Sequence, residues 1–176
     1  WLDPGRIKRD LSPNTELGAP LISGESYSLR ISAAWKDQTG NALIDGYHKE
    51  FISSFRDESI PDPSQWEVIS PATNTRNPLV IQFGESLDYS LLMSCLDVYA
   101  AGSREMNGNW IIGMEEKSIS FIPDEPWKTG NFILRIESRL EDLAANNLNR
   151  LFDVDLFHAE GRTSADAYKE IDFSIL

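Results

Sequence analysis

The sequence has very little cysteine and histidine. Cys95 is the single cysteine among 176 residues, and there are two histidines. One thiol can form neither an internal disulfide nor a thiolate metal cage, and two imidazoles disfavour a histidine-rich metal site. We therefore expect packing to stabilise the chain, and the sequence predicts no metal and no cofactor.

Basic charge is also scarce, because 16 basic residues face 28 acidic ones and the formal net charge is −12. No cluster of lysine or arginine is present that could attract phosphates or an anionic bilayer. No hydrophobic run is long enough to cross a membrane. The sequence thus predicts no nucleic-acid partner and no membrane insertion in this segment, while 41% hydrophobic residues indicate a folded core.

Catalytic motifs are missing as well. There is no nucleophile elbow, no phosphate-binding glycine loop and no zinc-protease helix motif. Cys95 falls on an apolar stripe, and His48 and His158 have no nucleophile at a suitable spacing. Glu115 and Glu116 are interpreted as solvated. We expect the chain not to be an enzyme.

Alternation of apolar and polar residues is the prevailing pattern, and it is typical of half-buried strands in antiparallel sheets. The predicted strands contain Tyr27/Leu29/Ile31, Leu79/Ile81/Phe83, Ile119/Phe121, Phe132/Leu134/Ile136, Phe152/Val154/Leu156 and Ile171/Phe173/Ile175. One short helix is predicted over 86–96, capped by Ser86. Residues 57–65 contain two prolines and three acids, which predicts a linker.

An internal repeat appears when residues 27–43 are laid over 132–148 at a constant offset of 105. The two copies agree at Leu29/Leu134, Arg30/Arg135, Ile31/Ile136, Asp37/Asp142, Asn41/Asn146 and Leu43/Leu148. A weaker echo pairs Tyr47 with Tyr168. A repeat near 100 residues has the size of an Ig-type sandwich rather than of a solenoid repeat.

These residues resemble a known family. Phe121-x-Pro123, a Gly130-x-Phe132 strand entry and the Asp37-x-x-Gly40-Asn41 turn resemble bacterial Ig-like domains of the S-layer-protein type. The resemblance implies an all-β chain of tandem Ig-like antiparallel β-sandwich domains. Residues 1–58 would be the C-terminal part of a first, incomplete domain, 59–65 a linker, and 66–176 a complete second domain with one short helix.

The resemblance also implies a function and a location. Such domains serve as spacers, stalks or binding units of secreted or envelope-attached proteins, so we expect a non-catalytic structural or interaction module outside the cytoplasm. Trp1 is no initiator methionine, and we expect missing sequence upstream. Because 1–58 has too few strands to close a two-sheet core, we expect it to contact the second domain or to self-associate.

The turn motif has a physical rationale. Asp37 can accept a backbone hydrogen bond from two residues on, Gly40 permits positive φ, and the amide of Asn41 ties the loop. In the second copy Asp142 and Asn146 keep their places, but an alanine replaces the glycine. We expect the left-handed conformation there to move to the following asparagines, Asn146 or Asn147.

Calcium binding is an alternative for these side chains, since Asp37, Asn41, Asp142 and Asn146 offer oxygen ligands and Asp57, Glu58 and Asp62 crowd the linker. No continuous loop supplies the six to eight oxygens required. We favour turn capping and a solvated linker.

Sugar or protein binding is the second alternative, because five tryptophans lie in an acidic β-rich chain. Trp66, Trp110 and Trp35 are interpreted as packing residues. Trp127 follows a proline and is the best exposed candidate for ligand contact, together with the loop 103–109. Between the two interpretations of Trp127, we favour a packing role at an interface over ligand contact.

Overall fold

The computed structural model describes residues 21–55, 57–100, 102, 104–152 and 166–176. The chain divides into two compact units, Trp1–Asp57 (unit 1) and Glu58–Leu176 (unit 2). Strands in antiparallel sheets dominate the described residues, and helix is limited to short turns. The prediction of an all-β chain is confirmed.

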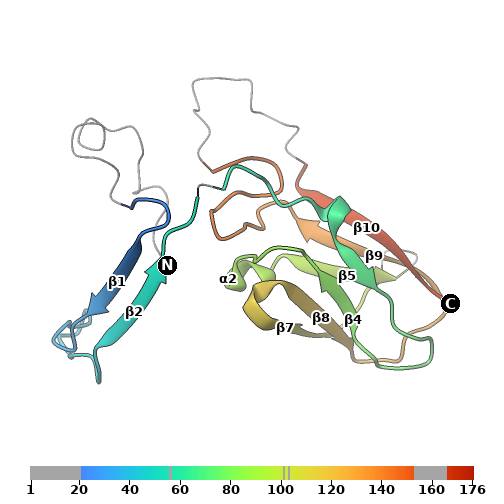
Figure 1. The fold of residues 1–176 in the computed structure, drawn as a ribbon. Coiled ribbons are helices and arrows are strands. Elements are labelled where there is room, and N and C mark those ends of the chain that lie inside the picture. Colours follow the sequence, from blue (N-terminus) through green and yellow to red (C-terminus); the bar gives the residue numbers. More distant parts are fainter. Residues whose placement is uncertain (1–20, 56, 101, 103, 153–165) are drawn as a thin grey trace. The chain divides into compact units, whose positions relative to one another are not determined.

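Unit 1 contains an antiparallel hairpin of β1 (Ser26–Ile31) and β2 (Tyr47–Ile52), drawn in blue and cyan in Figure 1. The register pairs Tyr27 with Phe51 and Ile31 with Tyr47. Since side chains alternate along a strand, these four residues share one face with Leu29. The predicted alternation therefore produces a hairpin with one apolar face.

Unit 2 is built from two four-stranded antiparallel sheets, in the order β3-β4-β8-β7 and β10-β9-β5-β6 (Figure 1). The strands of the first sheet are β3 (Glu67–Ile69), β4 (Leu79–Gln82), β7 (Gly108–Ile112) and β8 (Ser118–Pro123). Those of the second are β5 (Leu96–Ala100), β6 (Arg104–Glu105), β9 (Gly130–Glu137) and β10 (Tyr168–Ile175).

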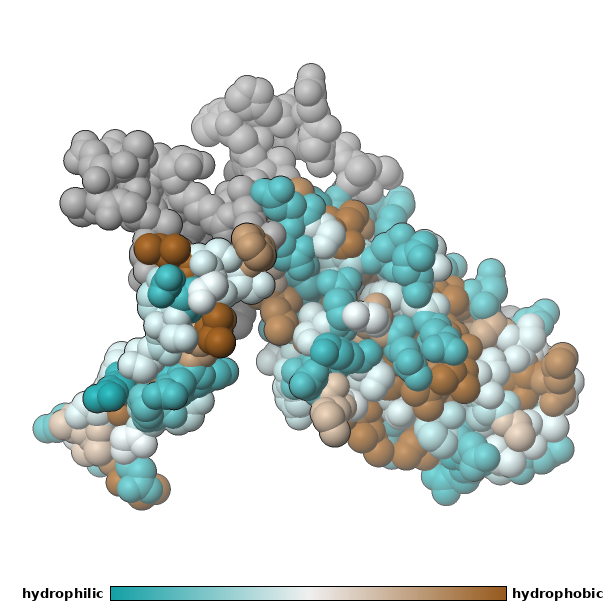
Figure 2. Space-filling model, in the orientation of Figure 1, coloured by the Kyte–Doolittle hydropathy of each residue, from teal (hydrophilic) through white to brown (hydrophobic). Residues whose placement is uncertain are grey.

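The core of unit 2 lies between the inner faces of the two sheets, as in a β-sandwich. The alternating residues of β8 and β9 account for its centre, where Ile119, Phe121, Leu134 and Ile136 are at most 2% exposed. Hydrophobic side chains also remain at the surface of both units, as the brown areas of Figure 2 show.

The predicted helix is much shorter in the structure. Helix α2 spans only Tyr89–Leu92, and its N-cap is Asp88, whose Oδ1 accepts a hydrogen bond from Leu91 N, so the expected cap at Ser86 is wrong. β5 begins at Leu96 because pairing with β9 takes over the residues that follow. None of the described helices is long and apolar enough to cross a membrane.

The predicted linker also differs from the structure. Residues 59–65 fall within unit 2, where Pro61 is fully buried and a 3-10 turn, η2 (Pro63–Gln65), is capped by Asp62. The Asp62 side chain accepts hydrogen bonds from the backbone and hydroxyl of Ser64, which lower its pKa. The predicted strand of Phe152, Val154 and Leu156 falls mostly in 153–165, outside the described residues.

Candidate functional site

The repeated turn of unit 1 is held by the carboxylate of Asp37. Its Oδ1 accepts hydrogen bonds from Thr39 N, Thr39 Oγ1 and Asn41 N, and its Oδ2 accepts one from Asn41 Nδ2 at 3.2 Å. Gly40 has φ of +91°. These hydrogen bonds, led by that of the Thr39 hydroxyl, lower the pKa of Asp37 to about 2.

The turn of unit 2 repeats this network at the same offset of 105. Asp142 Oδ1 accepts from Ala144 N and Asn146 N, and Asp142 Oδ2 accepts from Asn146 Nδ2 at 2.8 Å. The expected shift of the left-handed conformation to Asn146 or Asn147 is wrong, because Ala145 itself has φ of 66°. Several hydrogen bonds of about 1 kcal/mol each outweigh a left-handed cost of about 1–2 kcal/mol.

The environments of the two turns differ although their hydrogen bonds match. Asp142 and Asn146 are 4% and 2% exposed, whereas Asp37 and Asn41 lie at the surface. In both turns N–H donors engage both oxygens of the aspartate. This is the bonding expected of a capped turn, which is how the sequence analysis interprets Asp37, Gly40, Asn41, Asp142 and Asn146.

Trp127 is not exposed, so the alternative of an exposed ligand contact is wrong and the side chain packs instead. The side chain has 0% exposure, and its ring packs edge-on against Phe121, Phe132 and Phe173 at centroid distances of 6.0, 5.4 and 6.4 Å. Its Nε1 donates a hydrogen bond of 2.8 Å to the carbonyl of Asn77. A ring enclosed in this way offers no face for a sugar to stack on.

The other candidates are scattered. Trp66 is buried, whereas Trp35, expected to pack, is 65% exposed. Cys95 is buried, and desolvation raises the pKa of its thiol. His48 lies on the exposed side of β2, and His158 lies outside the described residues. Glu115 pairs with Lys117 in an exposed 3-10 turn, η3 (Met114–Glu116).

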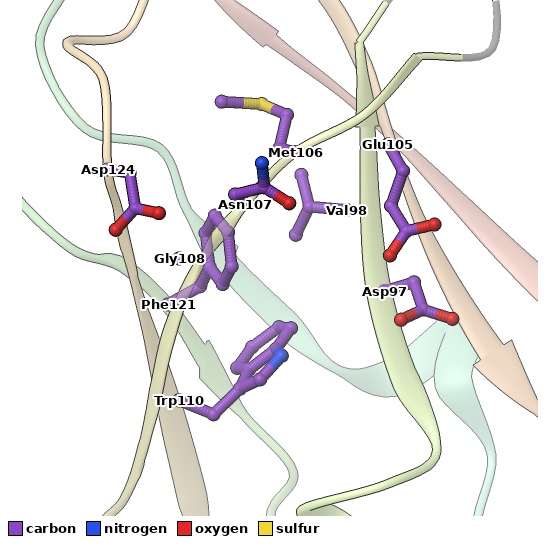
Figure 3. A pocket seen from close by; sticks show the side chains of 9 residues that line it. All are labelled: Asp97, Val98, Glu105, Met106, Asn107, Gly108, Trp110, Phe121 and Asp124. Carbon is purple, nitrogen blue, oxygen red and sulfur yellow. The ribbon is translucent and has the colours of Figure 1, made fainter.

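A hollow of about 370 Å³ opens beside β6 and β7, which are edge strands of the two sheets of unit 2 (Figure 3). Figure 3 shows the carboxylates of Asp97 and Glu105 on one side, Asp124 on the other, and the rings of Trp110 and Phe121 between them. The remaining lining residues are Val98, Met106, Asn107 and Gly108.

The backbone around Gly108 explains how the hollow forms. Met106 N donates to Val98 O at 2.8 Å and Asp124 N donates to Asn107 O at 3.0 Å, so residues 106–107 bridge the two sheets. A Cβ on Gly108 would lie 2.5 Å from both Ile122 O and the Phe121 ring. Only glycine therefore fits there.

The hollow is strongly acidic. The nine described residues that line it include three carboxylates and no basic side chain. Burial raises the pKa of Asp97, and the nearby charge of Glu105 raises it further, while Arg135 acts in the opposite direction. The arrangement suits a ligand that presents hydroxyl or protonated amine donors to the carboxylates and an apolar side to Trp110.

Sequence reasoning identified part of this hollow. The loop 103–109, an alternative ligand-contact segment from the sequence, contributes its described residues 105–108 to the lining of the hollow. Asp97 and Trp110 were missed because strand alternation does not show which residues flank an opening between sheets. Comparisons with protein family models, curated proteins and solved structures found no match to the chain. Function is therefore inferred from the repeated hairpin, the turns and the hollow.

Proposed function

We propose that the chain is a non-catalytic structural and interaction module, a spacer or stalk made of repeated Ig-like β-domains. The observation that carries this proposal is the repetition of one hairpin and one hydrogen-bonded turn in two consecutive units. Repetition of a folding unit sets distance along a chain, which is a mechanical rather than a chemical role. The buried Cys95, whose thiol pKa is raised, is a poor nucleophile.

The resemblance to bacterial Ig-like domains extends the proposal to a location. We place the module in a secreted or cell-envelope protein of a bacterium, where tandem sandwiches hold other parts of the protein away from a surface. The antiparallel sandwich of unit 2 and the repeated Asp-x-x-x-Asn turn support this assignment.

Single-molecule force spectroscopy tests the spacer role. The full chain is stretched between handles attached to its two ends. Unit 2 should unfold in one event that releases about 400 Å of contour length, since its 119 residues extend by about 3.5 Å each. Gradual extension without a discrete event would contradict the proposal, because such a unit could not hold a distance under load.

Ligand binding at the acidic hollow is the second candidate function. Trp110 beside Asp97, Glu105 and Asp124 favours a carbohydrate or a basic peptide segment over an anionic ligand. The test is an NMR titration that follows the indole N–H of Trp110 with a panel of neutral oligosaccharides and with a lysine-rich peptide. A saturable shift that Asp97→Asn weakens would support binding, and unchanged spectra at millimolar ligand would exclude it.

A further inference from the structure

Strand β7 is an edge strand without the usual protection against pairing with another chain. Native edge strands are kept from adding further strands by shortness, by charged side chains or by proline. Among the described strands of unit 2, β3 has three residues, β6 has two, and β10 contains Lys169, Glu170 and Asp172. The sequence of β7 is Gly-Asn-Trp-Ile-Ile, with neither charge nor proline. It is therefore the edge of unit 2 best suited to accept a further strand.

The backbone of β7 presents hydrogen-bonding groups on its open side. Gly113 N donates to Ser118 O just beyond the end of β7, so the hydrogen-bonded pairs with β8 fall at every second residue back from Gly113. The same alternation directs the N–H and C=O groups of Gly108, Trp110 and Ile112 away from β8. No described strand pairs with that side of β7. These three residues can therefore bond to an added strand.

The two faces of β7 offer different contacts to such a strand. Ile111 is 54% exposed on the outer face of the sheet. The acidic hollow lies on the inner side, because its lining includes the core side chains Val98 and Phe121 together with Trp110 (Figure 3). Since side chains alternate along a strand, an added strand would direct one set of side chains towards the hollow and the other set beside Ile111.

Charge selects the kind of side chain that enters the hollow. Within the described part of the chain, the side chains of Asp97, Glu105 and Asp124 form no ion pair. Burial and the nearby charge of Glu105 raise the pKa of Asp97, so these carboxylates lie where a cation would be stabilised. A lysine or arginine side chain is the natural complement of this lining.

A second copy of the chain fits this edge poorly. Residues 58–176 contain nine basic and twenty acidic side chains, a net charge of −11, so two copies of unit 2 repel each other. β7 also has no basic side chain to place in the hollow of another copy. A basic segment of a different protein has neither disadvantage.

We infer that the edge of β7 binds an extended, basic segment of a partner protein by β-strand addition. Backbone hydrogen bonds to Gly108, Trp110 and Ile112 hold the segment, a lysine or arginine side chain enters the hollow, and apolar side chains pack beside Ile111. This inference rests on the second candidate function, since it assigns the hollow to a basic peptide, and it is independent of the spacer role.

An NMR titration of the isotope-labelled full chain tests the proposal with a short peptide of alternating valine and lysine. Saturable shifts should appear at the amides of Gly108, Trp110 and Ile112 by about 5 mM peptide, because one short strand forms a small interface. These amides should also exchange more slowly with solvent in the complex. A peptide of alternating valine and glutamate should leave the spectrum unchanged, because the hollow repels it.

A matched peptide with methylated backbone nitrogens separates strand addition from binding in the hollow alone. It keeps the lysine charges but loses the donors that pair with β7, so it should bind at least about tenfold more weakly. Equal affinity of the two peptides would overturn strand addition and leave the hollow as a site for basic side chains. No saturable shift with either peptide would overturn both the strand addition and the basic-peptide assignment of the hollow.

A pair of variants tests the position of the contact. Ile111→Lys places a charge of the peptide's own sign at the edge and should weaken binding by about tenfold. Ile69→Lys is the matched control, since Ile69 is 42% exposed on β3, the opposite edge of the same sheet. Equal weakening by both variants would overturn the proposal. A peptide-free chain that self-associates unless it carries Ile111→Lys would also overturn it, in favour of pairing between two copies.

Discussion

Replacement of Trp127 by phenylalanine tests whether this tryptophan is a core residue or a surface one. The change removes the hydrogen bond from Nε1 to the Asn77 carbonyl, and an acceptor left unsatisfied costs about 1–3 kcal/mol. The smaller ring also leaves a cavity among Phe121, Phe132 and Phe173, at about 1–2 kcal/mol. We expect a total loss of about 2–5 kcal/mol in the free energy of unfolding of unit 2.

Urea denaturation followed by circular dichroism measures this loss. With a slope of about 1–1.5 kcal/mol per molar urea, the midpoint should fall by about 1–5 M. Trp35→Phe is the matched control, because Trp35 is 65% exposed and the same substitution there should cost less than about 0.5 kcal/mol. Equal, small effects for both variants would refute the burial of Trp127 and restore it as a surface residue.

Three further predictions concern the turn and the hollow. Gly108→Ala should destabilise unit 2 by about 2–3 kcal/mol in the same urea assay, since a Cβ would lie 2.5 Å from the Phe121 ring and from a backbone oxygen. Asp97→Asn should stabilise unit 2 at pH 7. The pKa of Asp97 is raised in the folded state, so an ionised Asp97 destabilises the folded form. Below pH 3.8 Asp97 is protonated in both states, and the extra stability of the variant over the parent should disappear. The amide shifts of Thr39 and Asn41 should titrate with a midpoint near pH 2. Because the pKa of Asp37 is lowered to about 2, its carboxylate stays ionised at pH 3.8 and keeps the hydrogen bonds from Thr39 and Asn41, which are lost near pH 2. A midpoint at pH 3.8 would show that these hydrogen bonds are absent.

The sequence predicted the strands well where alternation was strict. Phe132, Leu134 and Ile136 alternate without interruption, and all three are buried on β9. The repeat at offset 105 likewise located two turns with matching hydrogen bonds, because aspartate and asparagine at that spacing bond to nearby backbone amides wherever they occur.

Register was harder to predict. The echo that pairs Tyr47 with Tyr168 is displaced by one residue in the structure, since Tyr47 lies across from Ile31 whereas Ile136, the counterpart of Ile31, lies across from Lys169. A slip of one residue exchanges the two faces of a strand, and sequence identity at a single tyrosine does not fix it.

Long-range closure of the sandwich decided the remaining differences. Trp127 follows a proline in a loop, which suggested exposure, but its backbone N–H donates to Thr75 O and its carbonyl accepts from Asn74 N. These bonds fold the loop inwards over the core. The acidic hollow depends similarly on Asp97 and Asp124, which are 27 positions apart in the sequence and are brought together only by sheet packing.

Ring contacts measured by NMR test the central claim most directly, namely that unit 1 carries the same hairpin as unit 2. Nuclear Overhauser spectra of the full chain should show cross-peaks between the rings of Tyr27 and Phe51 and between those of Phe132 and Phe173. Cross-peaks for Phe132 and Phe173 alone, or contacts of Tyr27 shifted to a neighbour of Phe51, would contradict the equivalence of the two hairpins and with it the repeated-module account.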